Sequence, residues 1–164
     1  MELKPCWSHY LKAKQLMAQH HWPEAHYLLI DVLHHLPKHL YDAAQNAQTK
    51  PCQFICLMTG LKESAIYQSD ILSKMGQDQY AYQAINQTYA LLQFLSIETS
   101  PLIRSVANVI NTLCNELLEH IHRFCHNQRS ASWRIEYQNV EKTHRYFTQL
   151  KYHQGQPCDI PILN

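Results

Sequence analysis

The 164 residues predict an all-α protein of six or seven antiparallel helices. Apolar residues recur with helical spacing along most of the chain, and the alternation and tight Asn-Gly or Asp-Gly turns of strands are absent. Only three glycines interrupt this pattern. No low-complexity linker divides the chain, so we expect one helical domain over residues 1–155 and an extended tail over residues 156–164.

The densest apolar face of the chain lies between two prolines, Pro23 and Pro37. Pro23 fits the first turn of a helix, where its missing N–H costs nothing. Pro37 is expected to end the same helix, because proline cannot donate to the preceding turn and clashes with it. Neighbouring helices are expected over residues 7–20 and 38–48, the second of them short and rich in alanine.

Glycine, serine and proline mark the later helices. A helix is expected over residues 51–75, and Gly76 follows it as a typical C-terminal signal. Gly60 falls inside this helix, where it indicates a kink or a close contact with another helix. Ser100 and Pro101 predict a helix start, since serine caps free N–H groups and proline fits the first turn. The last three helices are expected over residues 77–96, 101–127 and 130–153.

The charge of the chain argues against a nucleic-acid partner. Basic and acidic side chains nearly balance, at 14 and 13, and the net charge is +1. The densest basic stretch, residues 123–134, holds only three arginines and one histidine, whereas phosphate binding needs a concentrated cationic patch. No run of about 18 apolar residues occurs, so no membrane span is expected either.

The six cysteines and the N-terminal residues predict a cytoplasmic protein with reduced thiols. The cysteines form no Cys-x-x-Cys pair, and the first residues lack the apolar segment of a signal peptide. No Gly-rich phosphate loop and no Gly-x-Ser-x-Gly elbow occurs. We therefore expect no enzymatic activity, no catalytic residue and no cofactor.

One stretch carries small and large side chains where two closely packed helices need them, with an aromatic at the turn and a proline at the end. These residues are Ala13, Leu16, Trp22, Ala25, Leu29 and Pro37. Over residues 4–37 the pattern resembles one unit of the tetratricopeptide repeat, which has a period of about 34 residues. On its first helix, His9 and Lys12 replace the Trp and Leu that the family prefers.

The resemblance weakens after residue 37. Thr59, Glu63 and Ile71 replace the Ala, aromatic and Pro of the next period, and a degenerate echo follows in residues 72–96. We therefore expect a tetratricopeptide-like hairpin on which a non-repetitive bundle is assembled. The resemblance implies a protein-binding scaffold without catalysis, such as an adaptor, a regulator or a chaperone of a bacterial secretion or flagellar type.

The aromatic side chains outnumber those that the apolar stripes need, and Tyr and Trp are enriched at interfaces. We therefore expect another protein or a peptide to bind in a groove along the first two helix pairs. Tyr82, Tyr146 and Tyr152 lie off the main stripes and are expected to be exposed contacts. The residues expected to border the groove are Tyr10, Lys14, Trp22, His26, Tyr27 and Lys38.

Two alternative functions stay open. The first is a metal-binding bundle that uses two Glu-x-x-His pairs, Glu119/His122 and Glu141/His144, as di-iron carboxylate proteins do. The first pair lies opposite the apolar stripe of its helix and further glutamates are scarce, so no metal ligand is assigned. The second is a homodimeric bundle, with the near-heptad stripe of residues 102–124 as its seam.

Overall fold

The computed structural model describes residues 1–154, which form helices joined by short turns, as the sequence predicts. No strand occurs within these residues. The predicted tail over residues 156–164, and Gly155 before it, lie outside the described residues. The six helices are α1 (Leu3–Ala18), α2 (Trp22–Gln45), α3 (Pro51–Lys74), α4 (Asp78–Ser96), α5 (Pro101–Asn127) and α6 (Ala131–Gln154).

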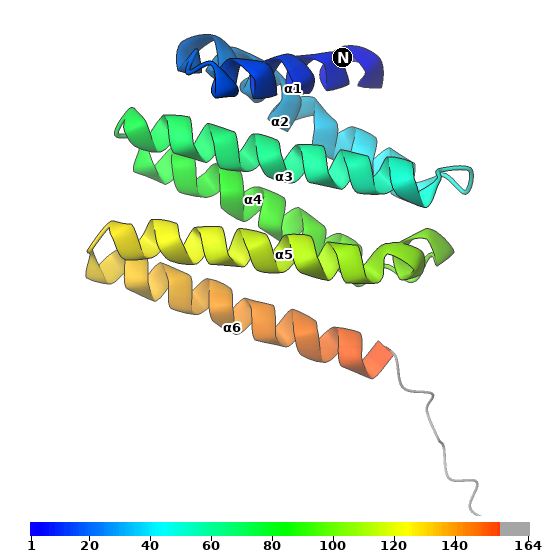
Figure 1. Cartoon of the computed structure of the whole chain (residues 1–164). Helices are drawn as coiled ribbons and strands as arrows, with labels where there is room; N and C mark the ends of the chain where they lie inside the picture. The colour runs from blue at the N-terminus through cyan, green and yellow to red at the C-terminus, as the bar shows by residue number, and fades with distance from the viewer. Residues whose placement is uncertain (155–164) are drawn as a thin grey trace, which may run out of the picture.

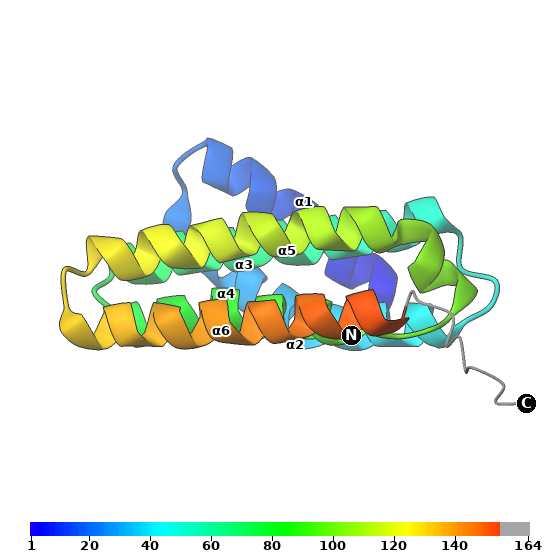
Figure 2. The same ribbon diagram turned by 90° about the horizontal axis from the view of Figure 1, so that it is seen from below.

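The helices pair into hairpins, α1 with α2, α3 with α4 and α5 with α6, and the hairpins stack on one another (Figure 1). Helices α1, α3 and α5 form one layer and α2, α4 and α6 form the other, which is clearest from below (Figure 2). The hairpins are joined because α2 packs on α3 and α4 packs on α5. No segment of the described helices combines the length and the apolar character that a bilayer crossing requires.

The turn inside each hairpin contains one residue with left-handed backbone. These residues are His20, Gly76 and Arg129, with φ angles of 62°, 72° and 50°. Gly76 is the C-terminal signal expected from the sequence, because glycine adopts positive φ without the penalty of a side chain. After α3, the N–H of Gln77 donates to the Leu72 carbonyl at 2.9 Å, which closes the helix end.

Pro37 does not end a helix, and this sequence-based prediction is wrong. Helix α2 continues through Pro37 to Gln45, so the short helix expected over residues 38–48 is the second half of α2. A proline inside a helix costs about 3 kcal/mol. Leu36 and Leu40 are both fully buried on the continuing face, and each contributes about 1.5–3 kcal/mol. Burial of this face therefore outweighs the cost of the proline.

The hairpins also repeat with a longer period than the tetratricopeptide unit. The first residues of α3 and α5, Pro51 and Pro101, lie 50 positions apart, against about 34 in that family. The closing proline of the resemblance, Pro37, lies inside a helix and not at its end. The N-terminal helices thus form a hairpin as expected, with a second arm longer than the resemblance implies.

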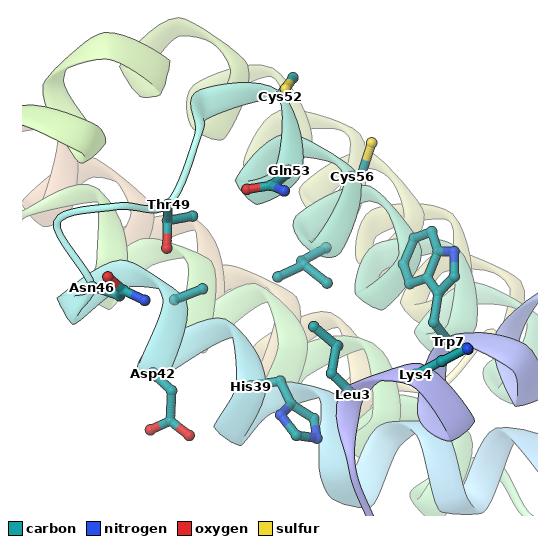
Figure 3. Close-up of a pocket in the computed structure, with 12 residues that line it drawn as sticks. Leu3, Lys4, Trp7, His39, Asp42, Asn46, Thr49, Cys52, Gln53 and Cys56 are labelled. Carbon is teal, nitrogen blue, oxygen red and sulfur yellow. The ribbon is translucent and has the colours of Figure 1, made fainter.

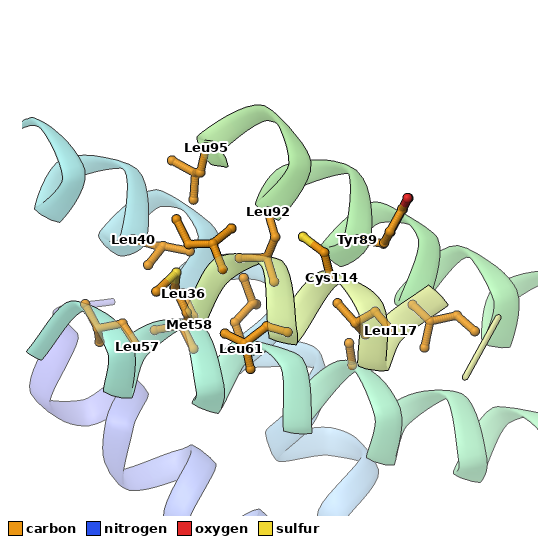
Figure 4. Close-up of a cluster of buried hydrophobic side chains, with 14 of the residues drawn as sticks. Leu36, Leu40, Leu57, Met58, Leu61, Tyr89, Leu92, Leu95, Cys114 and Leu117 are labelled. Carbon is orange, nitrogen blue, oxygen red and sulfur yellow. The ribbon is translucent and has the colours of Figure 1, made fainter. Parts of the chain in front are cut away.

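The main core lies between the two layers and uses side chains of α2, α3, α4 and α5 (Figure 4). The α5 stripe of residues 102–124 belongs to this core. Val106, Leu113, Leu117, Ile121 and Phe124 are buried there by the chain's own helices. The stripe is therefore not free to serve as the seam of a homodimer.

Helix α6 contributes little to the core and closes the stack, with Ile135, Tyr146 and Leu150 among its exposed side chains. Val140 is its one buried residue among those described, while Trp133 packs at the edge. Tyr82, which was expected to be an exposed contact, is buried against Trp133 and donates to Glu136 at 2.9 Å. The other two tyrosines of that prediction, Tyr146 and Tyr152, are exposed.

Candidate functional site

A groove of about 780 Å³ opens where α1, the end of α2 and the start of α3 meet (Figure 3). Its apolar lining comes from all three helices, with Leu3 and Trp7 on α1, Ala43 on α2 and Leu57 on α3. Around these lie polar and thiol-bearing side chains, among them Lys4, His39, Asp42, Asn46, Cys52 and Cys56. The groove therefore joins an apolar floor to a rim that can form hydrogen bonds.

Trp7 is held in the groove wall by a close approach of α1 to α3. A Cβ atom at Gly60 would lie 2.7 Å from Cζ3 of the Trp7 ring, which is too short for any side chain. Gly60 therefore marks a close helix contact, one of the two possibilities that its place in the sequence indicates. The ring of Trp7 also packs on that of Tyr10, with centroids 4.7 Å apart.

Hydrogen bonds to Glu63 of α3 also stabilise the close contact between α1 and α3. The hydroxyl of Tyr10 and the ammonium of Lys14 both donate to Oε2 of Glu63, each at 2.7 Å. Burial would raise the pKa of Glu63, but the hydrogen bonds from Lys14 and Tyr10 lower it below its ordinary value. Burial and then the Glu63 carboxylate raise the pKa of Tyr10 to about 12. Helix α1 is thus anchored to α3 beside the groove.

The six residues expected to border a groove are divided among several places. Tyr10 is buried, and with Lys14 it serves the α1–α3 contact. The ammonium of Lys74 lies 3.6 Å from the ring centroid of Trp22, near the other end of α3. The remaining three are His26, which is within 3.2 Å of Gln68, and the exposed Tyr27 and Lys38.

None of those six residues lines the observed groove. The sequence offered one usable signal for its position, which is Gly60 inside a helix. The missing side chain of that glycine leaves room for a large side chain of a neighbouring helix, and Trp7 on α1 fills this room. The lining residues of α2 and α3 were not predicted, because the sequence predicts a helix end at Pro37 and the groove needs the second half of α2.

A second polar cluster joins α4, α5 and α6 and centres on Gln93, which is almost fully buried. Its amide nitrogen lies 2.9 Å from both the Tyr89 hydroxyl and Nδ1 of His144. Its amide oxygen accepts from the Lys151 ammonium at 3.2 Å. Lysine only donates, so this bond fixes the orientation of the amide. The amide nitrogen therefore donates to His144, whose Nδ1 accepts and whose ring is neutral.

The pKa of His144, which joins α6 to α4, makes the stability of the protein dependent on pH. Burial, and then the Lys151 charge, lower this pKa below its ordinary value of 6.5, while Glu141 opposes the change. The unfolded chain therefore binds a proton at His144 before the folded chain does, and stability falls as pH drops below about 6.5. We expect urea unfolding followed by circular dichroism to give a smaller free energy of unfolding at pH 5.5 than at pH 7.5.

The variant His144→Gln isolates this histidine from the other eleven. Its side chain keeps an acceptor near Gln93 but does not titrate, so its stability should fall less between the two pH values. Equal losses in the variant and the wild type would contradict the assignment of the effect to His144.

The two Glu-x-x-His pairs do not converge. Glu141 lies 3.3 Å from Arg145, while His144 turns toward α4 and Gln93. His122 lies exposed on α5, where its ring packs on that of Tyr137. Within residues 1–154, no group of three or more His, Cys, Asp or Glu side chains is placed to hold a metal ion.

The thiols differ sharply in their surroundings. Cys52 and Cys56 are exposed at the groove, one helical turn apart on α3, whereas Cys6, Cys114 and Cys125 are buried. Burial raises the pKa of Cys114 to about 11, so this thiol is protonated at neutral pH.

Comparison of the chain with protein-family models, with curated proteins and with solved structures finds no match.

Proposed function

We propose that the protein binds a peptide segment of another protein in the groove between α1, α2 and α3. The observation that carries the proposal is the apolar lining of Leu3, Trp7, Ala43 and Leu57, which is open to solvent and framed by polar side chains. Binding surfaces of this kind bury apolar anchors at their centre and form hydrogen bonds at their rim. The groove has the size of a ligand site.

The chemistry of the lining defines the partner segment. Trp7 offers a broad, rigid surface at a low entropic cost, so it suits a large apolar side chain. Lys4 and Asp42 give the rim one charge of each sign, which favours neither an acidic nor a basic peptide. The partner is therefore a segment with large apolar residues and uncharged neighbours.

A stack of hairpins with an open apolar groove suits an adaptor or a chaperone that acts in the cytoplasm. Two side chains that could serve in catalysis are not free to do so. The Cys114 thiol is protonated, and Nδ1 of His144 is already bound by Gln93. Neither group is available as a nucleophile or a general base.

Selection of peptides from a random phage-displayed library tests the proposal. The library is selected on the wild-type chain, and the affinities of the selected peptides are measured by fluorescence polarisation. Selected peptides should share an apolar pattern. The variant Cys56→Arg places a bulky charge at the exposed wall of the groove and should weaken their binding by about tenfold or more, or about 1.4 kcal/mol.

The matched control is Ala131→Arg, which adds the same side chain at an exposed position at the start of α6. This variant should bind the peptides as the wild type does. The proposal fails if the selection yields no binding peptide, or if the peptides bind Cys56→Arg and the wild type equally well.

A further inference from the structure

The ammonium group of Lys151 lies at the meeting point of three helices without a carboxylate partner. It donates to the Asn111 amide oxygen of α5 at 2.9 Å and to the Gln93 amide oxygen of α4 at 3.2 Å. Within residues 1–154, every ion pair involves other side chains. One N–H of the ammonium therefore has no acceptor from these helices.

A cavity of about 400 Å³ adjoins this ammonium. Its lining includes Asn111, Asn115, His144, Thr148 and Lys151, and contains neither aspartate nor glutamate among the described residues. The oxygen of Asn111 is occupied by Lys151, which leaves its NH₂ group to donate. His144 accepts at Nδ1, so its proton is on Nε2 and this nitrogen donates as well. The cavity is thus lined by donors around one positive charge.

Such a lining lacks an acceptor with a negative charge. A half-buried cation without a counter-ion is costly, and burial already lowers the pKa of Lys151 below its ordinary value. A bound anion would pair with the ammonium and use the free N–H groups around it. One cation with neutral neighbours matches a group of single charge, because a doubly charged phosphate would keep one charge unpaired there.

We propose that this cavity binds a small organic carboxylate, with its carboxylate group on the Lys151 ammonium. The amides of Asn111 and Asn115 provide further donors. The exposed ring of Tyr152 lines the mouth of the cavity, where it can cover the apolar part of the ligand. The lining of this site comes from α5 and α6, so the site is separate from the groove formed by α1, α2 and α3.

Titration calorimetry and ¹H–¹⁵N spectra with acetate, propionate, lactate, benzoate and succinate test the proposal on the full chain. At least one of these should bind saturably with a dissociation constant below about 10 mM, with shifts at Asn111, Asn115 and Thr148. Inorganic phosphate should bind more weakly, and chloride should not bind saturably. Tighter binding of phosphate, or no saturable binding of any carboxylate, would overturn the proposal.

Two variants place the ligand on Lys151. Lys151→Met removes the charge and keeps the length of the side chain, and should weaken binding by about tenfold or more. Lys142→Met, at an exposed lysine of the same helix, is the matched control and should bind as the wild type does. Asn115→Asp leaves the hydrogen bonds of Lys151 intact but adds a negative charge to the lining, and should also weaken binding. Unchanged affinity in both Lys151→Met and Asn115→Asp would contradict the site.

Discussion

Phe54→Ala is expected to lower the free energy of unfolding by about 3–5 kcal/mol, which is the range for a large aromatic side chain deleted from a packed core. Phe54 is fully buried in the main core, as the fourth residue of α3. The removed ring leaves a cavity that the surrounding helices can fill only in part. Urea denaturation followed by circular dichroism measures the loss, as a lower midpoint at an unchanged slope.

Phe94→Ala is the matched control for that experiment. This phenylalanine is 62% exposed on α4, and its ring packs edge-on against Phe147, with centroids 5.5 Å apart. Its removal should cost about 0.5–1.5 kcal/mol, the contribution of one aromatic pair. Similar losses in the two variants would mean that the packing of α3 differs from the one described.

Gln93→Leu is expected to lower the free energy of unfolding by about 2–3 kcal/mol. The leucine fills a similar volume but removes hydrogen bonds to Tyr89, His144 and Lys151 together. Each buried group left without a partner costs about 1–3 kcal/mol. The sum is reduced because Tyr89 still reaches His144 at 2.7 Å, and Lys151 still reaches Asn111.

The same denaturation experiment with Gln83→Leu provides the comparison, because Gln83 is exposed on the same helix. That variant should stay within about 0.5 kcal/mol of the wild type. Gln93→Leu should also release α6 locally, which hydrogen exchange detects as faster exchange in residues 131–154 than in α3. Uniform exchange along the chain of the variant would argue against a specific role of Gln93 in holding α6.

The later helices were predictable because local signals and the apolar pattern agree there. Ser100 accepts a hydrogen bond from the N–H of Ile103 at 3.2 Å, as a capping serine should, and α5 begins at Pro101. Gly76 has the positive φ angle that its place after α3 requires. At these positions local residues alone determine where a helix begins or ends, without contacts from distant parts of the chain.

Pro37 shows where local reasoning fails. A proline signals a helix end only if nothing offsets its cost, and in α2 the buried face on both sides of Pro37 does so. The apolar residues after it, Leu40 and Ala44, indicated this outcome. How much their burial stabilises α2 could be judged only once α3 and α4 were seen packed against them.

The groove was less predictable than the fold, because its lining comes from three segments far apart in the sequence. Trp7 and Trp22 are similar as sequence features, yet only Trp7 lines the groove. The difference depends on Gly60, which lets the ring of Trp7 approach α3. The carboxylate site was harder still, since Lys151 looks like any other lysine near the end of a helix until Gln93 and Asn111 are placed beside it.

The stacking of hairpins has a consequence for how the chain folds. Each helix packs mainly on the helices next to it in the chain, so native contacts join residues close in sequence and need little loop closure. Proteins with such local contacts fold in microseconds to milliseconds, and each hairpin can nucleate as soon as it leaves the ribosome. Opening should begin at the ends of the stack, while the α3–α4 hairpin, covered on both sides, should open last.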